Sequence, residues 1–143
     1  MRDAPEIKGW CPGALTPMES GDGLLLRAKI IGSKLSLTQL SEIAAIALDC
    51  GNGWIDLSQR AQLQIRGVTE TTLAPAQARL KSIGLLASDA ATESRLNIMA
   101  SPLAGAASPD ANEIAARLAR AIAEDQALAS LPGKFLFLVD DLA

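Results

Sequence analysis

The stretch that decides the fold runs from residue 54 to residue 66 and reads Trp54-Ile55-Asp56-Leu57-Ser58-Gln59-Arg60-Ala61-Gln62-Leu63-Gln64-Ile65-Arg66. Two short runs, 54–57 and 61–66, carry apolar residues at alternate positions and flank the polar tripeptide 58–60. Such alternation is typical of strands that bury one face, and a short polar connection joins antiparallel neighbours. The stretch therefore predicts a β-hairpin.

A strand and a helix precede this hairpin. Residues 24–31 are apolar with charges two apart and follow the turn residues 21–23, which predicts a strand. Ser36 is suited to cap the next helix, because Gln39 lies three residues later and completes a capping box. Gly51 ends that helix. Its predicted buried stripe is Leu40, Ile43, Ala44, Ala47 and Leu48.

A second helix and a fourth strand follow the hairpin. Thr71 or Thr72 can cap the helix, Gly84 sits where a C-cap glycine ends it, and Leu73, Leu80 and Ile83 form its buried stripe. Residues 95–100 predict the fourth strand. The order strand, helix, strand, strand, helix, strand is the split βαβ arrangement of an α+β ferredoxin-like sandwich, with the first and third strands side by side at the centre of the sheet.

The last residues predict one more helix and one more strand. Ser108-Pro109-Asp110 is a helix start with proline at the first helical position, and an apolar stripe continues to about Asp125 through Ile114, Leu118, Ala121 and Ile122. Residues 134–139 predict a strand for which we expect neither a crossover nor a partner in the chain. We therefore expect one domain over residues 1–105, and in residues 106–143 the start of another, truncated domain.

The amino-acid composition limits the kinds of catalytic site, metal site and binding partner that the chain can have. The 143 residues include no histidine and no tyrosine, which excludes a Ser-His-Asp or Cys-His nucleophile system, a histidine-ligated metal and a tyrosine acid. The net charge of −3 argues against a general nucleic-acid or anionic-membrane binder, because both need an excess of Lys and Arg. No apolar run approaches the roughly 20 residues that span a bilayer, and the N-terminus lacks an apolar signal region, so we expect a cytoplasmic protein.

The two cysteines, Cys11 and Cys50, are too few for a disulfide framework or for a metal site closed by about four ligands. We therefore expect both to be free thiols. Cys11 is either a site thiol or a buried structural thiol, and we expect the Cys50 side chain, at the end of the first helix, to serve only in packing. Trp10 and Trp54 predict core or interface positions.

Strand alternation predicts one cationic sheet face. Leu63 and Ile65 point one way, and the opposite parity holds the candidate ligand-binding residues Arg60, Gln62, Gln64 and Arg66. Arg27 and Lys29 in the first strand, and Arg95 in the fourth, follow the same division. This face is either merely solvated or binds an anion, since guanidinium groups make bidentate contacts with carboxylates. It has no aromatic residues on the central strands, which disfavours RNA.

Several motifs together resemble one family. They are residues 9–23, beginning Gly9-Trp10-Cys11-Pro12-Gly13, residues 51–67, Asn97-Ile98-Met99-Ala100-Ser101-Pro102-Leu103-Ala104-Gly105, and Leu131-Pro132-Gly133-Lys134-Phe135. These resemble the N-terminal part of precorrin-3B synthases, within the nitrite/sulfite reductase superfamily. The resemblance covers essentially the whole chain. It implies a ferredoxin-like half-domain that pairs with a second one, followed by a sirohaem-type domain.

The resemblance also implies site residues. In the reductases basic residues grip the macrocycle and its anion, and motif by motif they correspond to Arg60, Arg95 and Lys134. A second reductase lysine falls on Leu136, which agrees better with a synthase acting on a polycarboxylated tetrapyrrole than with a sulfite or nitrite site.

The family implies an oxygen-dependent hydroxylation of precorrin-3A with lactone formation, in aerobic cobalamin biosynthesis, and an iron–sulfur cluster with a non-haem iron. The family's cluster cysteines correspond to no residue here, so we expect no cofactor in this chain, and no activity from it alone. Its expected partners are the tetrapyrrole and the missing C-terminal half, or a second copy on the same surface. The alternatives are a sulfite or nitrite reductase fragment, or a stand-alone module that binds an anionic small molecule, which should be monodisperse and have a partner for its last strand.

Overall fold

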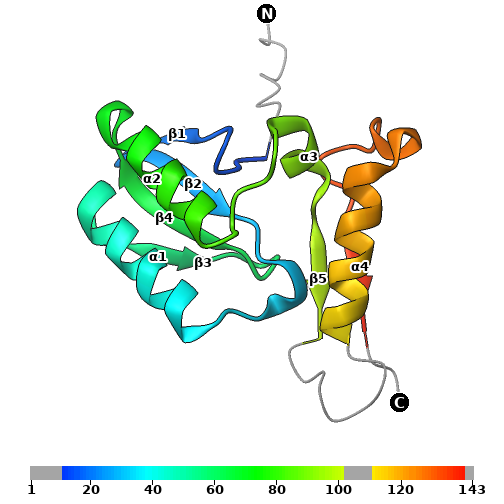
Figure 1. The fold of residues 1–143 in the computed structure, drawn as a ribbon. Helices are drawn as coiled ribbons and strands as arrows, with labels where there is room; N and C mark the ends of the chain where they lie inside the picture. Colours follow the sequence, from blue (N-terminus) through cyan, green and yellow to red (C-terminus); the bar gives the residue numbers. More distant parts are fainter. Residues whose placement is uncertain (1–10, 102–110, 141–143) are drawn as a thin grey trace, which may run out of the picture.

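The computed structural model describes residues 11–101 and 111–140, and places an antiparallel sheet of four strands beside a smaller layer built on α4 (Figure 1). The strand order of the sheet is β1-β2-β4-β3. The predicted hairpin is confirmed, because β3 (Ile55–Leu57) and β4 (Leu63–Val68) pair with Asp56 opposite Gln64.

The centre of the sheet is also as predicted. β2 (Gly23–Ala28) lies next to β4, with Arg27 opposite Gln64. A further strand, β1 (Met18–Ser20), pairs with the other edge of β2. The α+β ferredoxin-like fold is therefore confirmed.

Two helices cover one face of this sheet (Figure 1). α1 (Leu37–Cys50) begins with the predicted capping box between Ser36 and Gln39. α2 (Glu70–Ser82) begins at Thr69, not at Thr71 or Thr72, because the Thr69 side chain accepts from the backbone of Thr72. Gly84 follows α2 with φ of 74°, a left-handed conformation that glycine adopts without strain.

The core lies between these helices and the sheet. It contains Leu26, Ala28, Ile43, Ile46, Ala47, Cys50, Ile65, Val68, Ala76 and Leu80. The predicted stripe of α1 is wrong at Leu40, Ala44 and Leu48, which are exposed, Leu40 to 47% and Leu48 to 73%. Ile46 and Cys50 are buried in their place, because the helix turns a slightly different face to the sheet.

The prediction that residues 95–100 form the fourth strand of this sheet is wrong. A helix, α3 (Ala90–Arg95), occupies its first residue, and β5 (Ile98–Ala100) pairs in parallel with β6 (Phe137–Val139) in a separate two-stranded sheet. The physical reason is competition for one edge, since β1 already takes the place beside β2. The expectation that the last strand has no partner is therefore also wrong, and α4 (Ala111–Glu124) is its crossover.

The second layer has its own core. Ile98, Ala100, Ala111, Ala115 and Ile122 are buried together, whereas Ile114 of the predicted α4 stripe is 38% exposed. The layer is fastened to the first by a 3₁₀ turn, η1 (Ile31–Ser33), whose Ser33 hydroxyl accepts from the Ala100 backbone at 3.3 Å. A second such turn, η2 (Gln126–Leu128), follows α4.

Some predictions fall outside the described residues, namely Trp10, the helix start 108–110 and the domain division at residue 105. That division stays a prediction. Within the described ranges, no helix has the length and apolar character needed to cross a bilayer.

Candidate functional site

The face of the sheet opposite α1 and α2 is polar, as the alternation predicts, and its two ends differ. At one end, which we call the paired end, the Arg66 guanidinium contacts Asp22 at 2.8 Å, Asp56 at 3.3 Å and the Ser20 hydroxyl at 2.9 Å. The hydrogen bond from Arg66 lowers the pKa of Asp22 to about 2, and Asp22 in turn raises the pKa of Arg66. The guanidinium of this predicted site residue is therefore occupied by acids.

The two predicted glutamines support the backbone and a neighbouring arginine. The Gln62 side chain is buried, accepts from the Ile30 backbone N–H at 2.5 Å and donates to the Ile30 carbonyl at 3.4 Å. Gln64 faces Arg27 across the strands, and its amide oxygen accepts from Arg27 Nε at 3.1 Å and from Nη2 at 2.6 Å in the orientation that satisfies both groups. Gln62 thus fixes the chain just after β2, and Gln64 holds Arg27.

The other end, which we call the cationic end, gathers Arg27, Lys29 and Arg60. Lys29 is 8% exposed, and its burial lowers the pKa of its ammonium from 10.5 to about 8. The charges of Arg27 and Arg60 lower it further, while Glu93 and Cys11 act in the opposite direction. Burial also lowers the pKa of Arg27. Positive charges therefore lie close together here and partly out of water.

Arg60 reaches this end from the turn between β3 and β4. The Ser58 N–H donates to the Gln62 carbonyl, and Ala61 has φ of 53°, an unusual conformation for a residue with a Cβ. The Nη1 atom of Arg60 is buried and has no hydrogen-bond partner among the described residues. A buried N–H without an acceptor costs free energy, so an acceptor supplied by a ligand would be stabilising.

Arg95 lies at the end of α3. Its Nε donates to the Ala91 carbonyl at 3.2 Å and its Nη2 to the Thr92 hydroxyl at 3.3 Å, so the guanidinium folds back along its own helix. Its Nη1 atom is buried and, like that of Arg60, has no hydrogen-bond partner in the described part of the chain.

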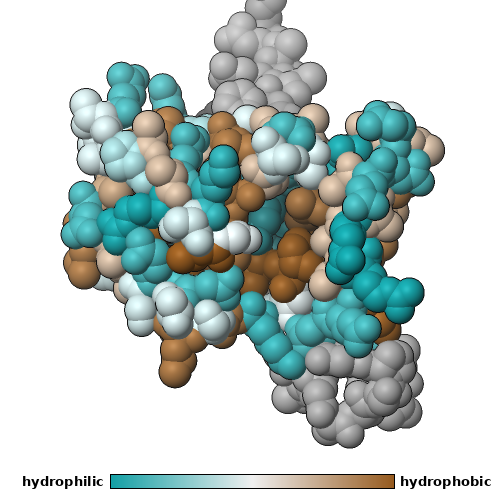
Figure 2. Space-filling model, in the orientation of Figure 1, coloured by the Kyte–Doolittle hydropathy of each residue, from teal (hydrophilic) through white to brown (hydrophobic). Residues whose placement is uncertain are grey.

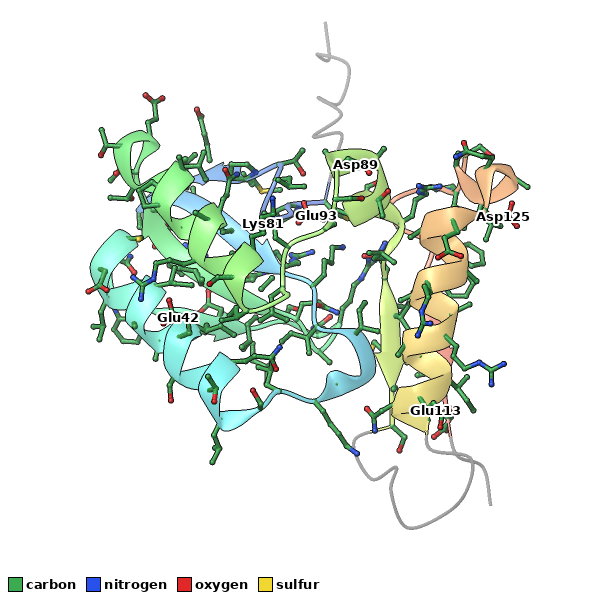
Figure 3. The ribbon with its side chains drawn as sticks, viewed as in Figure 1. Glu42, Lys81, Asp89, Glu93, Glu113 and Asp125 are labelled. Carbon is green, nitrogen blue, oxygen red and sulfur yellow. The ribbon has the colours of Figure 1, made fainter. Side chains whose placement is uncertain are left out.

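A buried carboxylate holds the segment before β1. Glu93 is 1% exposed and accepts from the backbone N–H groups of Ala14 at 3.0 Å and Leu15 at 2.9 Å. It points from α3 toward that segment (Figure 3). A Cβ at Gly13 would lie 2.0 Å from a Glu93 oxygen, so only glycine permits this approach. Glu93 therefore positions the chain next to Cys11.

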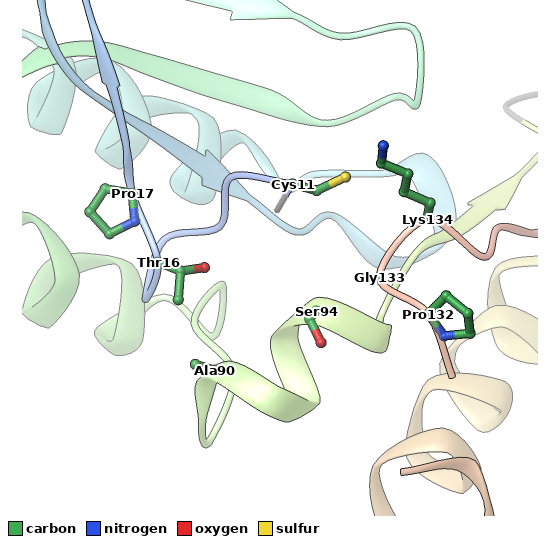
Figure 4. Close-up of a pocket in the computed structure, with 8 residues that line it drawn as sticks. All are labelled: Cys11, Thr16, Pro17, Ala90, Ser94, Pro132, Gly133 and Lys134. Carbon is green, nitrogen blue, oxygen red and sulfur yellow. The ribbon is translucent and has the colours of Figure 1, made fainter. Parts of the chain in front are cut away.

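Cys11 and Lys134 line a common groove of about 630 Å³, whose other lining residues are Thr16, Pro17, Ala90, Ser94, Pro132 and Gly133 (Figure 4). In that view the side chains of Cys11 and Lys134 extend to the same side of the groove. Lys134 is exposed, and Leu136, where the resemblance implies a second lysine in the reductases, is 39% exposed. The molecular surface also shows apolar side chains in the hollow between the two layers (Figure 2).

Strand parity predicts Arg27 and Lys29 as polar-face residues, and both lie at the cationic end. The sequence does not predict the site contacts of Glu93 and Asn97, because their partners Ala14 and Lys29 lie 79 and 68 positions earlier in the chain. Trp54, predicted as core or interface, is 71% exposed and so is not in the core.

Metal ligands are scarce. Among the described residues no group of three or more His, Cys, Asp or Glu side chains could hold a metal ion. Cys50 is buried in the helix–sheet core, whereas Cys11 is in the groove. These donors do not fit an iron–sulfur cluster, and the cofactor prediction stays untested.

Comparison with known proteins agrees with the fold. Residues 16–83 match the nitrite/sulfite reductase ferredoxin-like half domain. A precorrin-3B synthase from Sinorhizobium sp. is 36% identical over 66 residues, which are 46% of this chain and 14% of that protein. An assimilatory ferredoxin-dependent nitrite reductase from Haloferax mediterranei is 29% identical over 113 residues, which cover 68% of this chain and 19% of that protein. The chain thus spans less than a fifth of either relative.

Proposed function

We propose that this chain is part of a precorrin-3B synthase and that its cationic end binds carboxylates of the tetrapyrrole substrate, because residues 16–83 match the nitrite/sulfite reductase ferredoxin-like half domain and the chain is similar to such a synthase. The observation that carries the proposal is the buried Nη1 of Arg60, which has no hydrogen-bond partner among the described residues and lies within electrostatic range of the Lys29 ammonium. Three cations gathered on a rigid sheet, near an acid, Glu93, that already accepts two backbone hydrogen bonds, suit an anionic ligand.

A large polycarboxylate fits the arrangement better than a small oxyanion. The candidate cations are spread over the end of β2, the β3–β4 turn and the groove with Lys134, so a ligand with several carboxylates could contact more than one of them. The apolar Leu136 next to this groove supplies no further charge, and its partial exposure suits contact with a hydrocarbon ring.

The complete reaction proposed is the oxygen-dependent hydroxylation of precorrin-3A with closure of a lactone. The role that we propose for this chain's own residues is to bind and orient the substrate, with Arg60, Lys29 and Arg27 at the cationic end, Lys134 in the groove that it shares with Cys11, and Arg95 at the end of α3. The described donors do not fit the family's iron–sulfur cluster, so we derive no chemical step through it. Free Cys11 and Cys50 suit the reducing cytoplasm that we propose as its location.

Two other candidates have observations in their favour. The nitrite reductase from Haloferax mediterranei covers more of the chain than the synthase does, which favours a reductase fragment. The pairing of β6 with β5 favours a stand-alone module that binds an anionic small molecule. The intact mass of the native protein in its source cells separates them: a species much heavier than 14.9 kDa supports an enzyme part, and one of 14.9 kDa supports the module.

The binding proposal is tested by titrating uroporphyrin, a porphyrin polycarboxylate, against the chain and its Arg60→Ala variant. We expect the variant to bind about tenfold more weakly, because a charge-assisted hydrogen bond is lost. The matched control is Arg79→Ala, since Arg79 pairs with Glu42 at 2.6 Å and Asp49 at 2.8 Å on the helical face. Absence of binding, or equal binding by both variants, would contradict the proposal.

A further inference from the structure

Asn97 is a buried polar residue between the end of α3 and the start of β5, and is 4% exposed. Its Oδ1 accepts a hydrogen bond from Lys29 Nζ at 2.5 Å. Its Nδ2 donates to the carbonyl oxygens of Ser94 at 2.8 Å and Gly133 at 2.9 Å. One amide side chain therefore joins its own α3–β5 connection to two segments that are distant in the sequence, the end of β2 and the residues before β6.

Each of these segments carries a basic residue of the candidate site. Lys29 belongs to the cationic end, Ser94 precedes Arg95, and Gly133 precedes Lys134. Because the amide is buried and uses both its donors and its acceptor, displacing any one segment would leave a buried polar group unpaired. The uncharged Asn97 side chain thereby sets where the segments that carry Lys29, Arg95 and Lys134 lie relative to one another.

Because the Asn97 amide is neutral, it binds the Lys29 ammonium without cancelling its charge. Around the Lys29 ammonium, Arg27 and Arg60 disfavour its charge, and Glu93 and Cys11 favour it. Both Glu93 oxygens already accept backbone hydrogen bonds. An amide oxygen holds the ammonium in place and leaves its charge available to a ligand, whereas a carboxylate at the same position would neutralise it.

We propose that Asn97 is a positioning residue that fixes the spacing between Lys29 and Lys134, and thereby makes the site prefer rigid polycarboxylates over flexible ones. This inference rests on the proposed function. A tetrapyrrole carries its carboxylates around a rigid ring, so affinity is gained only where the cations match their separation. A short flexible polycarboxylate such as citrate adjusts to one local cluster and does not need that match.

The test compares uroporphyrin and citrate binding by the wild-type chain, Asn97→Leu and Asn97→Asp. We expect Asn97→Leu to weaken uroporphyrin binding about tenfold and citrate binding about twofold or less. We expect Asn97→Asp, which keeps the shape, to weaken uroporphyrin binding as well and to raise the pKa of Lys29, followed by NMR of the lysine side chains. If Asn97→Leu does not fold, as judged by its circular dichroism melt, the isosteric Asn97→Asp provides the test.

A double-mutant cycle with Lys134→Met adds a second readout. If Asn97 acts by placing Lys134, Asn97→Leu should cost little further uroporphyrin affinity in the Lys134→Met background, and additive losses would contradict this. A purely structural role would lower melting temperatures but leave the ratio of the two affinities unchanged, and that result would overturn the inference alone. Failure of the wild-type chain to bind uroporphyrin overturns the proposed function, and this inference with it.

Discussion

The paired end and the cationic end of the sheet carry arginines of the same strand parity in opposite electrostatic settings. Arg66 has two carboxylates and a hydroxyl within 3.3 Å, whereas Arg60 has a buried N–H without a partner among the described residues and lies in the electrostatic range of Lys29. The Arg66 guanidinium is thus satisfied by side chains of the chain itself. The Arg60 guanidinium keeps a donor for an acceptor from outside, which is why we propose that it binds the ligand.

The difference has an energetic consequence. Ion pairs that are partly exposed, such as Arg66 with Asp22, contribute little to stability and tolerate water. The largely buried charge of Lys29 destabilises the free protein, because burial and the nearby Arg27 and Arg60 disfavour it more than Glu93 favours it, and an anionic ligand would offset that cost. The following predictions change the charge at one of the two ends and state the effect on ligand affinity or on stability.

The largest effect is expected from Arg60→Asp, which replaces a cation of the cationic end with an acid. The introduced carboxylate would pair with Arg27 and Lys29 and repel the ligand, so uroporphyrin binding should fall about a hundredfold. Fluorescence titration measures the affinity, and thermal unfolding shows whether the variant is folded. A folded variant with wild-type affinity would mean that the two ends do not differ in function.

The next effect is a pH dependence set by Lys29. Its pKa is lowered to about 8 from 10.5, so between these values the unfolded chain binds more protons than the folded one, and stability rises with pH. We expect a gain of about 3 kcal/mol in the free energy of unfolding across that window, to be tested by denaturant unfolding from pH 7 to pH 10.5. Uroporphyrin binding should weaken as the pH rises through about 8, because the ammonium loses its charge.

The matched variant for this prediction is Lys29→Met, which keeps the length of the side chain without its charge. It should remove most of the rise in stability across the window and most of the pH dependence of binding. At pH 7 it should also be more stable than the wild type by about 1–2 kcal/mol, because the buried charge is gone while one hydrogen bond is lost. A pH response equal to that of the wild type would assign the titration to another group.

The sequence predicts the parts of this site that depend on neighbours in the chain. The hairpin, the Ser36 capping box and the division of polar and apolar faces follow from contacts within a few residues or from strand parity. Parity could not separate Arg66 from Arg60, because Asp22 reaches Arg66 across 44 residues of sequence. The fourth strand was misplaced for a similar reason, since β1 is only three residues long and lacks an apolar pattern, yet occupies the contested edge.

The smallest effect is expected from Asp22→Asn, which changes the paired end toward the cationic one. The carboxylate has its pKa lowered to about 2 by Arg66, so its stabilising contribution is present above its ordinary value of 3.8 and is lost as the pH falls through about 2. The variant should be slightly less stable at pH 7 and should lack that part of the acid-induced loss, as shown by urea unfolding between pH 2 and pH 7. Its uroporphyrin affinity should change by less than about twofold, because Arg66 retains Asp56 and remains exposed to water, where an added cation contributes little. A large gain in affinity would show that an arginine on this face becomes a ligand site as soon as an acid is removed, and that pairing alone separates the two ends.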